Sequence, residues 1–129
     1  MKITVIFLFL ILSLLLFFYL HKESTPNPAI HTIPTAQFRE KIDQDSSKQL
    51  VDVRTALEYK RGHLKSSDNI NYLVPGFKEK FKFYDKKKPL YIYCRSGHRS
   101  SGAAEVLAEE GFTEIYELQG GILEWNKSK

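Results

Sequence analysis

The residue types best suited to covalent chemistry gather in one short segment, Cys94-Arg95-Ser96-Gly97-His98-Arg99. This segment contains the chain's only cysteine together with two arginines. A cysteine thiolate is a strong nucleophile, and arginine side chains attract anions through charge-assisted hydrogen bonds. The segment therefore predicts nucleophilic chemistry by Cys94 on an anionic substrate.

The flanking sequence predicts how this segment is held. Strand-forming residues at 90–93 precede it, and a helix-forming run at 100–110, closed by Gly111, follows it. A tight loop between a strand and a helix places backbone N–H groups at the helix N-terminus, where they attract anions and favour a thiolate. A buried structural cysteine is the alternative. Ligand sites of α/β sheets, however, lie at the carboxyl ends of strands, so we expect a reactive thiol.

The segment 94–100 resembles the active-site loop of the rhodanese family, the single-domain sulfurtransferases. Other segments match motifs of that family in the family's order: Asp52-Val53-Arg54, Glu58-Tyr59, Gly62-His63-Leu64, Asn69-Ile70, Gly111-Phe112 and the segment 118–125. The resemblance extends from about Ile33 to Trp125. One departure is Ser66-Ser67, where the family usually has glycine and alanine, and it affects only that turn.

This resemblance implies a thiosulfate sulfurtransferase-like activity with Cys94 as the catalytic nucleophile and no cofactor. In the implied reaction the thiolate takes the outer sulfur of a small anionic donor such as thiosulfate, and a thiol, protein or cyanide acceptor then removes it. Asp52 and Arg54 are implied to support the loop, although Arg54 could instead form a surface salt bridge with Glu58. The residues implied to bind the substrate are Arg95, Ser96, Gly97, His98 and Arg99.

The order of expected elements predicts an α/β fold, a small mostly parallel sheet with helices on both faces. The expected strands are 49–54, 70–73, 90–93 and 113–118, and the expected helices are 36–42, 55–60, 77–84, 100–110 and a short one from 122. We interpret His63 as fixing a turn and Trp125 as a core residue. Aromatic residues and lysines alternate at 77–84, but helical spacing favours a core-facing aromatic stripe over nucleic-acid binding.

Two alternative functions differ in chemistry. Cysteine-dependent phosphatases carry five residues between cysteine and arginine, whereas four separate Cys94 from Arg99 here. The smaller loop should fit a sulfur better than a tetrahedral phosphate, which argues against a phosphatase or arsenate reductase. A persulfide carrier or interaction module that delivers sulfur to one partner protein would need the same cysteine and loop, so the sequence leaves that alternative open.

The N-terminus is strongly apolar, and residues 3–20 contain no charged side chain. As a helix they would extend about 27 Å, close to the ~30 Å of a bilayer core. The run is longer than the apolar core of most signal peptides, and no small-residue cleavage pattern follows. We therefore favour an uncleaved signal anchor over a cleaved signal peptide. The domain is expected outside the cytoplasm, anchored at the cell envelope or, after cleavage, secreted or periplasmic.

The whole chain is then divided into the hydrophobic segment 1–21, a proline-containing linker at 22–30 and one domain at 31–129. A net charge of +4 suits a small anionic substrate and does not by itself indicate nucleic-acid binding. A single cysteine excludes an internal disulfide and a cysteine-rich metal site, and we expect no metal. Membrane contact is expected through residues 3–20 alone.

Overall fold

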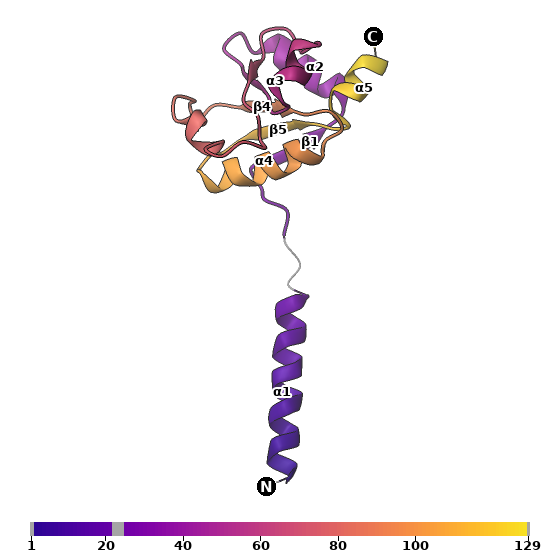
Figure 1. The fold of residues 1–129 in the computed structure, drawn as a ribbon, viewed down its shortest axis with the longest axis vertical. Coiled ribbons are helices and arrows are strands. Elements are labelled where there is room, and N and C mark those ends of the chain that lie inside the picture. The colour runs from indigo at the N-terminus through magenta and orange to yellow at the C-terminus, as the bar shows by residue number, and fades with distance from the viewer. Residues whose placement is uncertain (1, 22–24, 129) are drawn as a thin grey trace.

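The computed structural model describes residues 2–21 and 25–128. Its helices and strands follow one another in the order α1 (Lys2–Leu20), β1 (Ile30–Ile33), α2 (Thr35–Gln44), β2 (Gln49–Asp52), α3 (Ala56–Lys60), β3 (Asp68–Asn69), the 3₁₀ helix η1 (Lys78–Phe81), β4 (Leu90–Tyr93), α4 (His98–Glu109), β5 (Ile115–Leu118) and α5 (Gly121–Lys127). Figure 1 shows the α/β domain, with its helices α2–α5 and the strands β1, β4 and β5 labelled, and α1 outside it.

The strands form one five-stranded sheet in the order β1-β5-β4-β2-β3. All of its pairings are parallel, so the predicted mostly parallel sheet is confirmed and proves fully parallel. The central strand β4 is buried along its whole length, which explains why its sequence is continuously apolar or aromatic. Two strands on either side of β4 leave its carboxyl end, where Cys94 follows, in the middle of the sheet edge.

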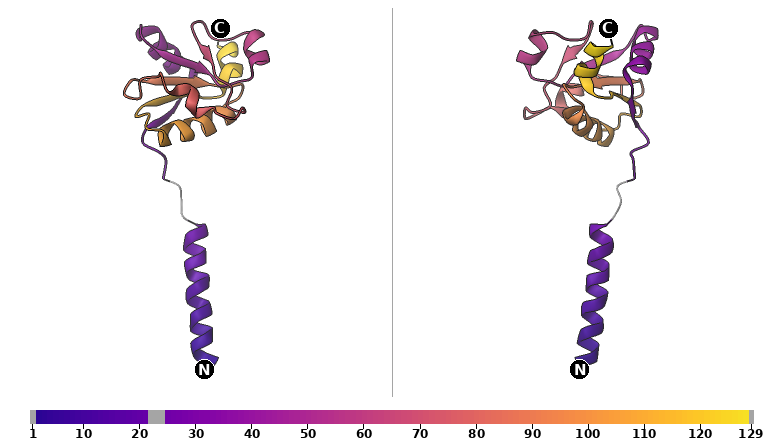
Figure 2. Two further views of the ribbon diagram at one scale, coloured as in Figure 1. Left: turned by 60° about the vertical axis from the view of Figure 1, so that its left-hand side comes forward. Right: turned by 90° about the vertical axis from the view of Figure 1, so that its right-hand side faces the viewer.

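Side-chain alternation divides the core into two clusters, one on each face. Along β4, Leu90 and Ile92 join the cluster under α4, whereas Tyr91 and Tyr93 join the cluster under α2 and α5. Figure 2 shows α4 along one face of the sheet and α2 with α5 on the other. The prediction of helices on both faces is confirmed.

The segment between β2 and β4 differs from the prediction. Instead of a strand at 70–73, β3 covers only Asp68–Asn69. The chain after it stays hydrogen-bonded to the neighbouring segment, because the N–H groups of Ile70 and Tyr72 donate to the carbonyls of Asp52 and Val53, both at 3.0 Å. The helix expected at 77–84 is a single 3₁₀ turn, η1. This segment is too short to be stable as an isolated α-helix, so burial of its aromatic side chains stabilises it.

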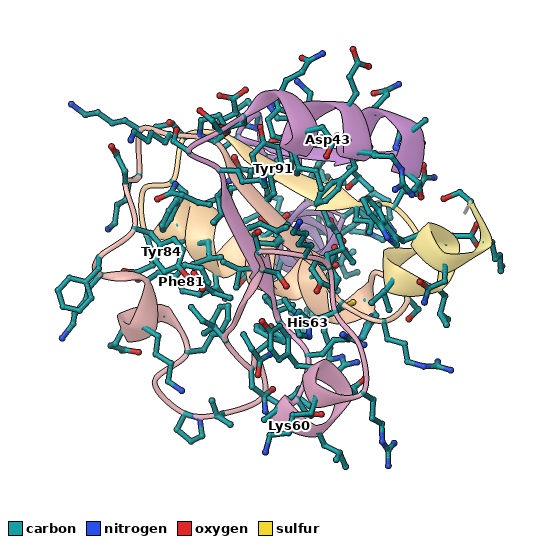
Figure 3. All side chains as sticks on the ribbon, turned by 90° about the horizontal axis from the view of Figure 1, so that it is seen from above. Asp43, Lys60, His63, Phe81, Tyr84 and Tyr91 are labelled. Atoms are coloured by element: carbon teal, nitrogen blue, oxygen red, sulfur yellow. The ribbon has the colours of Figure 1, made fainter. Side chains whose placement is uncertain are left out.

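The aromatic stripe itself is as predicted. Phe77 and Phe81 are buried in the cluster under α4, and Tyr84 packs against Phe81 with ring centroids 5.0 Å apart (Figure 3). The helix expected from residue 36 begins one residue earlier, because Pro34, in extended conformation, is the N-cap of α2 and Thr35 is its first helical residue. At α3, Thr55 caps the helix in a capping box with Glu58.

Helix α1 contains the apolar run Ile3–Leu20, which has a mean hydropathy of 2.9 and no buried residues. Its length and composition would allow it to cross a membrane, and an N-terminal signal sequence has the same properties. The residues 22–24 of the predicted linker lie outside the described residues. Residues 25–27, which the structure does describe, have neither helix nor strand.

Candidate active site

Cys94 directly follows β4 and is only 1% exposed. The backbone N–H of Gly97 donates a hydrogen bond to its Sγ atom at 3.1 Å. Gly97 is the N-cap of α4 and has φ +104°, a left-handed conformation that favours glycine. The thiol therefore receives a backbone donor at the start of a twelve-residue helix, where partial positive charge favours an anion.

The loop is supported from the opposite side by α5. The backbone N–H of Ile122 donates to the carbonyl of Cys94 at 2.9 Å, and that of Leu123 donates to the carbonyl of Arg95 at 3.2 Å. A Cβ atom added to Gly121, which has φ +63°, would lie 2.5 Å from the carbonyl oxygen of Arg95. Gly121 thus lets α5 approach the loop backbone closely.

Arg99 is held by Glu58 rather than free for a substrate. Its Nη1 and Nη2 atoms lie 2.7 Å from Oε2 and 2.7 Å from Oε1 of Glu58, a bidentate pair. The hydrogen bonds from Arg99 lower the pKa of Glu58 to about 2, and the same contact raises the pKa of Arg99. This pair joins α3 to the first turn of α4, so it ties the loop to the neighbouring segment.

The alternative considered for Arg54, a surface salt bridge with Glu58, is wrong, because Arg54 pairs with Asp52. Both residues are buried, with Arg54 Nη2 2.6 Å from Asp52 Oδ2 and Nε 3.0 Å from both carboxylate oxygens. Burial works against the charged guanidinium, but its hydrogen bonds with Asp52 raise the pKa of Arg54. Arg54 also donates to the carbonyl of Gly62 at 2.7 Å. The pair therefore fixes the turn before His63.

His63 has the turn-fixing contacts expected of it. Its Nδ1 atom lies 2.9 Å from the carbonyl oxygen of Tyr59, to which it can donate, and its ring stacks on that of Tyr59 at 3.7 Å. Figure 3 labels His63 close to α3. Trp125 is half-buried rather than a full core residue: it packs against the cluster under α2 and α5. The guanidinium of Arg39 stacks over its ring at 3.8 Å.

The remaining residues of the loop are more open. Arg95, Ser96 and His98 are exposed. Arg95 lines a cavity of about 460 Å³ together with Arg54, Glu58, Arg61 and Trp125. Arg61 and Arg95 form no ion pair with the residues that the structure describes. The cavity beside the loop is therefore positively charged and suits an anion.

One buried residue near the loop was missed by the sequence reasoning. Glu117 of β5 is 4% exposed, and its Oε1 and Oε2 atoms accept hydrogen bonds from Ser100 at 2.8 Å and Thr32 at 3.2 Å. Its signal in the sequence was its position two residues after Ile115, because residues i and i+2 of a strand share a face. An acidic residue on the core face needs partners, and those partners connect it to the loop.

Comparison with known proteins agrees with this geometry. The family model described as "Rhodanese-like domain" matches residues 34–128. The protein named "Uncharacterized protein YqhL" of Bacillus subtilis is 39% identical over 60% of this chain, and the match spans only 60% of that relative. The "Putative sulfurtransferase YtwF" of the same organism is 34% identical over 74% of this chain and 90% of its own.

The solved structures give the same result. The crystal structure of a rhodanese-like domain protein from Staphylococcus aureus has a TM-score of 0.65 and 26% identity, over 73% of this chain and 89% of that one. Other relatives carry the names thiosulfate sulfurtransferase, putative sulfur carrier protein and tRNA uridine(34) hydroxylase. The chain belongs to the rhodanese-like domain family, in which the names of relatives cover more than one reaction.

Proposed function

We propose that the protein is a sulfurtransferase that carries a sulfane sulfur on Cys94. The observation that carries this proposal is the hydrogen bond of 3.1 Å from the Gly97 N–H to Cys94 Sγ, at the N-terminus of α4. This contact stabilises a negative charge on the sulfur, both in the free thiolate and in a persulfide. Membership of the rhodanese-like family supports the same function.

The proposed reaction has two steps. The Cys94 thiolate attacks the outer sulfur of thiosulfate, so that a new S–S bond forms while the old one breaks, and sulfite leaves with the bonding electron pair. An acceptor thiolate or cyanide then attacks the outer sulfur of the Cys94 persulfide and releases the Cys94 thiolate. No oxidant or cofactor is needed, because the sulfur atom moves between nucleophiles.

Two features of the site support a small anionic donor. Only 1% of Cys94 is exposed, which favours a donor whose reactive atom is a single projecting sulfur. Arg95 and Arg61 line the adjacent cavity and offer guanidinium groups to an oxyanion. Arg95, Ser96, Gly97, His98 and Arg99 remain the proposed binding segment, but Arg99 acts through its pair with Glu58 rather than as an open donor.

A persulfide carrier is the second candidate, and the small exposure of Cys94 is the observation that favours it. A thiol that free acceptors reach slowly would keep its sulfur until a protein partner docks. The relative named as a putative sulfur carrier protein is in keeping with this candidate. A phosphatase is disfavoured, because the arginine that would hold the phosphate has both Nη atoms engaged by Glu58.

We further propose that α1 anchors the domain to a membrane, with the domain outside the cytoplasm. The uncharged eighteen-residue run Ile3–Leu20, with a mean hydropathy of 2.9, supports this location. The alternative is a cleaved signal peptide, which would release the domain. Intact mass of the chain purified from a membrane fraction distinguishes them: an anchor retains the full 15.0 kDa, whereas cleavage removes about twenty residues.

The experiment that tests the sulfurtransferase compares the full chain in detergent with Cys94→Ser. Thiosulfate:cyanide turnover and intact mass after thiosulfate treatment are measured on both. Turnover that disappears in the variant, with one added sulfur on the wild type, supports a turnover enzyme. Added sulfur without turnover supports the carrier. If the wild type neither gains sulfur nor turns over, thiosulfate is not its donor and the proposal fails in this form.

A further inference from the structure

A path of buried contacts connects Glu117 to the reactive cysteine through Gly97. Ser100 Oγ lies 2.8 Å from Glu117 Oε1 and 3.1 Å from the carbonyl oxygen of Gly97. The N–H of Gly97, which belongs to the preceding peptide group, donates to Cys94 Sγ at 3.1 Å. The two hydrogen-bonded groups of Gly97 are joined through its Cα atom, and Ser100 is fully buried.

The path can take two arrangements, because the Ser100 hydroxyl has one proton and two acceptors within reach. When Glu117 is ionised it can only accept, so Ser100 donates to the carboxylate. When Glu117 is protonated its O–H can donate to Ser100 Oγ, and the Ser100 proton then turns to the Gly97 carbonyl. The Gly97 carbonyl oxygen already accepts a hydrogen bond from the N–H of Ser101 at 3.0 Å. The charge of Glu117 thus decides whether this oxygen also accepts one from the Ser100 hydroxyl.

We propose that Glu117 is a positioning residue that controls the reactivity of Cys94 through Ser100 and Gly97. This inference rests on the proposed role of Cys94 as nucleophile. With Glu117 neutral, Ser100 holds the Gly97 carbonyl and so helps to keep the N–H of the same residue directed at Cys94 Sγ. The loss of the carboxylate also removes a negative charge from behind the loop, and both effects favour the thiolate. Ionised Glu117 withdraws the Ser100 donor from Gly97 and opposes a second negative charge on Cys94.

The surroundings of Glu117 move this switch to higher pH than an exposed glutamate would give. Burial raises the pKa of Glu117 above its ordinary value, and the hydrogen bonds from Ser100 and Thr32 oppose that shift only in part. Glu105 of α4 is a like charge that raises the pKa further. Glu117 forms no ion pair with any residue in the described part of the chain. The carboxyl therefore changes charge at a higher pH than an exposed glutamate.

The test measures alkylation of Cys94 by iodoacetamide against pH, which reports one thiol because the chain has one cysteine. In the wild type, the logarithm of the rate should rise with less than unit slope through the pH range where Glu117 ionises. Glu117→Gln removes the charge and keeps an acceptor for Ser100. It should restore unit slope and speed alkylation roughly three- to tenfold above that range.

Two further variants separate this mechanism from a loss of structure. Ser100→Ala removes the hydroxyl that links Glu117 to the Gly97 carbonyl, so the reduction in slope should become smaller than in the wild type. Because the carboxylate also loses a donor, the remaining effect should move to higher pH. Glu109→Gln removes an equal charge from the exposed side of α4 and should leave the profile unchanged. Identical profiles for wild type, Glu117→Gln and Ser100→Ala would overturn the inference.

Alkylation is independent of sulfur transfer, so the two proposals fail separately. Thiosulfate turnover of the same preparations is measured beside Cys94→Ser. If the alkylation profile changes in Glu117→Gln while the wild type neither gains sulfur from thiosulfate nor turns over, the proposed function fails and the role of Glu117 is supported. Turnover with an unchanged profile would support the sulfurtransferase and refute the role of Glu117.

Discussion

Glu58 and Arg99 form a bidentate ion pair across the candidate active site, with both nitrogen–oxygen distances at 2.7 Å. Glu58 also accepts a hydrogen bond from the backbone N–H of Thr55 at 3.1 Å, within the capping box of α3. The Glu58 carboxylate therefore caps α3 and also holds Arg99 in the first turn of α4, the helix that follows the Cys94 loop. The pair explains how a loop with few internal contacts keeps its position.

Replacement of Glu58 by glutamine should make the difference in stability from wild type depend on pH. Glutamine can still complete the capping box, so the change isolates the charged pair. The pKa of Glu58 is lowered from 4.5 to about 2, so the carboxylate contributes stability above pH 4.5 and loses that contribution as pH falls towards 2. We expect the variant to lose roughly 1–2 kcal/mol at pH 7 and to approach the wild type at pH 2.

Urea denaturation at several pH values measures this difference. Glu124→Gln, which removes a carboxylate paired with Lys127 on the exposed surface of α5, serves as the control and should not show the same pH dependence. A constant difference between Glu58→Gln and the wild type from pH 7 to pH 2 would show that the Arg99 pair does not set the pKa of Glu58.

The ion pair of Asp52 and Arg54 predicts a large loss of stability when one partner is removed. Asp52 is fully buried and Arg54 is 6% exposed, so Asp52→Asn leaves a buried guanidinium without its carboxylate. We expect a loss of roughly 3–5 kcal/mol in the free energy of unfolding. Glu110→Gln disrupts the exposed pair with Lys78 and should have little effect. Equal midpoints of denaturation for the two variants would contradict the assigned burial of the first pair.

The central part of the site could be predicted from the sequence because it depends on local patterns. The apolar run of β4, the cysteine that follows it and the helix-forming residues after Gly97 determine a strand, a loop and a helix. The capping box of Thr55 and Glu58 is also local, since its residues are three apart. Fold and family followed from such segments in a recognisable order.

The features that could not be predicted depend on contacts between distant segments. The sequence suggested only Arg54 as a partner for Glu58, and the folded chain places Arg99, 41 positions away, against it instead. Glu117 meets Ser100 across the interface of β5 and α4, which no periodicity reveals. The strand predicted at 70–73 was wrong, since β3 covers Asp68–Asn69 and residues 70–72 keep only single backbone hydrogen bonds to Asp52 and Val53.

Replacement of Gly121 by alanine should disturb the site, because the new side chain would crowd the loop backbone. In Gly121→Ala, the new Cβ would lie 2.5 Å from the carbonyl oxygen of Arg95 and 2.6 Å from that of Cys94. Since both contacts are with backbone, the loop must shift, and we expect a loss of roughly 2–4 kcal/mol in stability together with slower alkylation of Cys94.

Gly76→Ala is the matched control for this change. Gly76 also has a positive φ, +76°, but its added Cβ would meet only a flexible side-chain oxygen at 3.8 Å. Its cost should therefore be conformational strain alone, about 1 kcal/mol, with no change in the reactivity of Cys94. Chemical denaturation and alkylation kinetics measure the two effects, and equal alkylation rates in both variants would argue against support of the loop by Gly121.

Replacement of Arg95 by alanine should weaken binding of the sulfur donor and leave folding unchanged. Arg95 is exposed, forms no ion pair with the described residues and lines the positively charged cavity beside Cys94. If it orients an anionic donor, Arg95→Ala should raise KM for thiosulfate roughly tenfold, about 1.4 kcal/mol, while kcat and the unfolding midpoint change little. Lys87→Ala removes the same charge from an exposed turn and separates local binding from net charge.

The effect of Arg95→Ala should shrink at high salt, because exposed charges are screened. A KM that rises equally in both variants would assign the effect to net charge instead of to a guanidinium at the site.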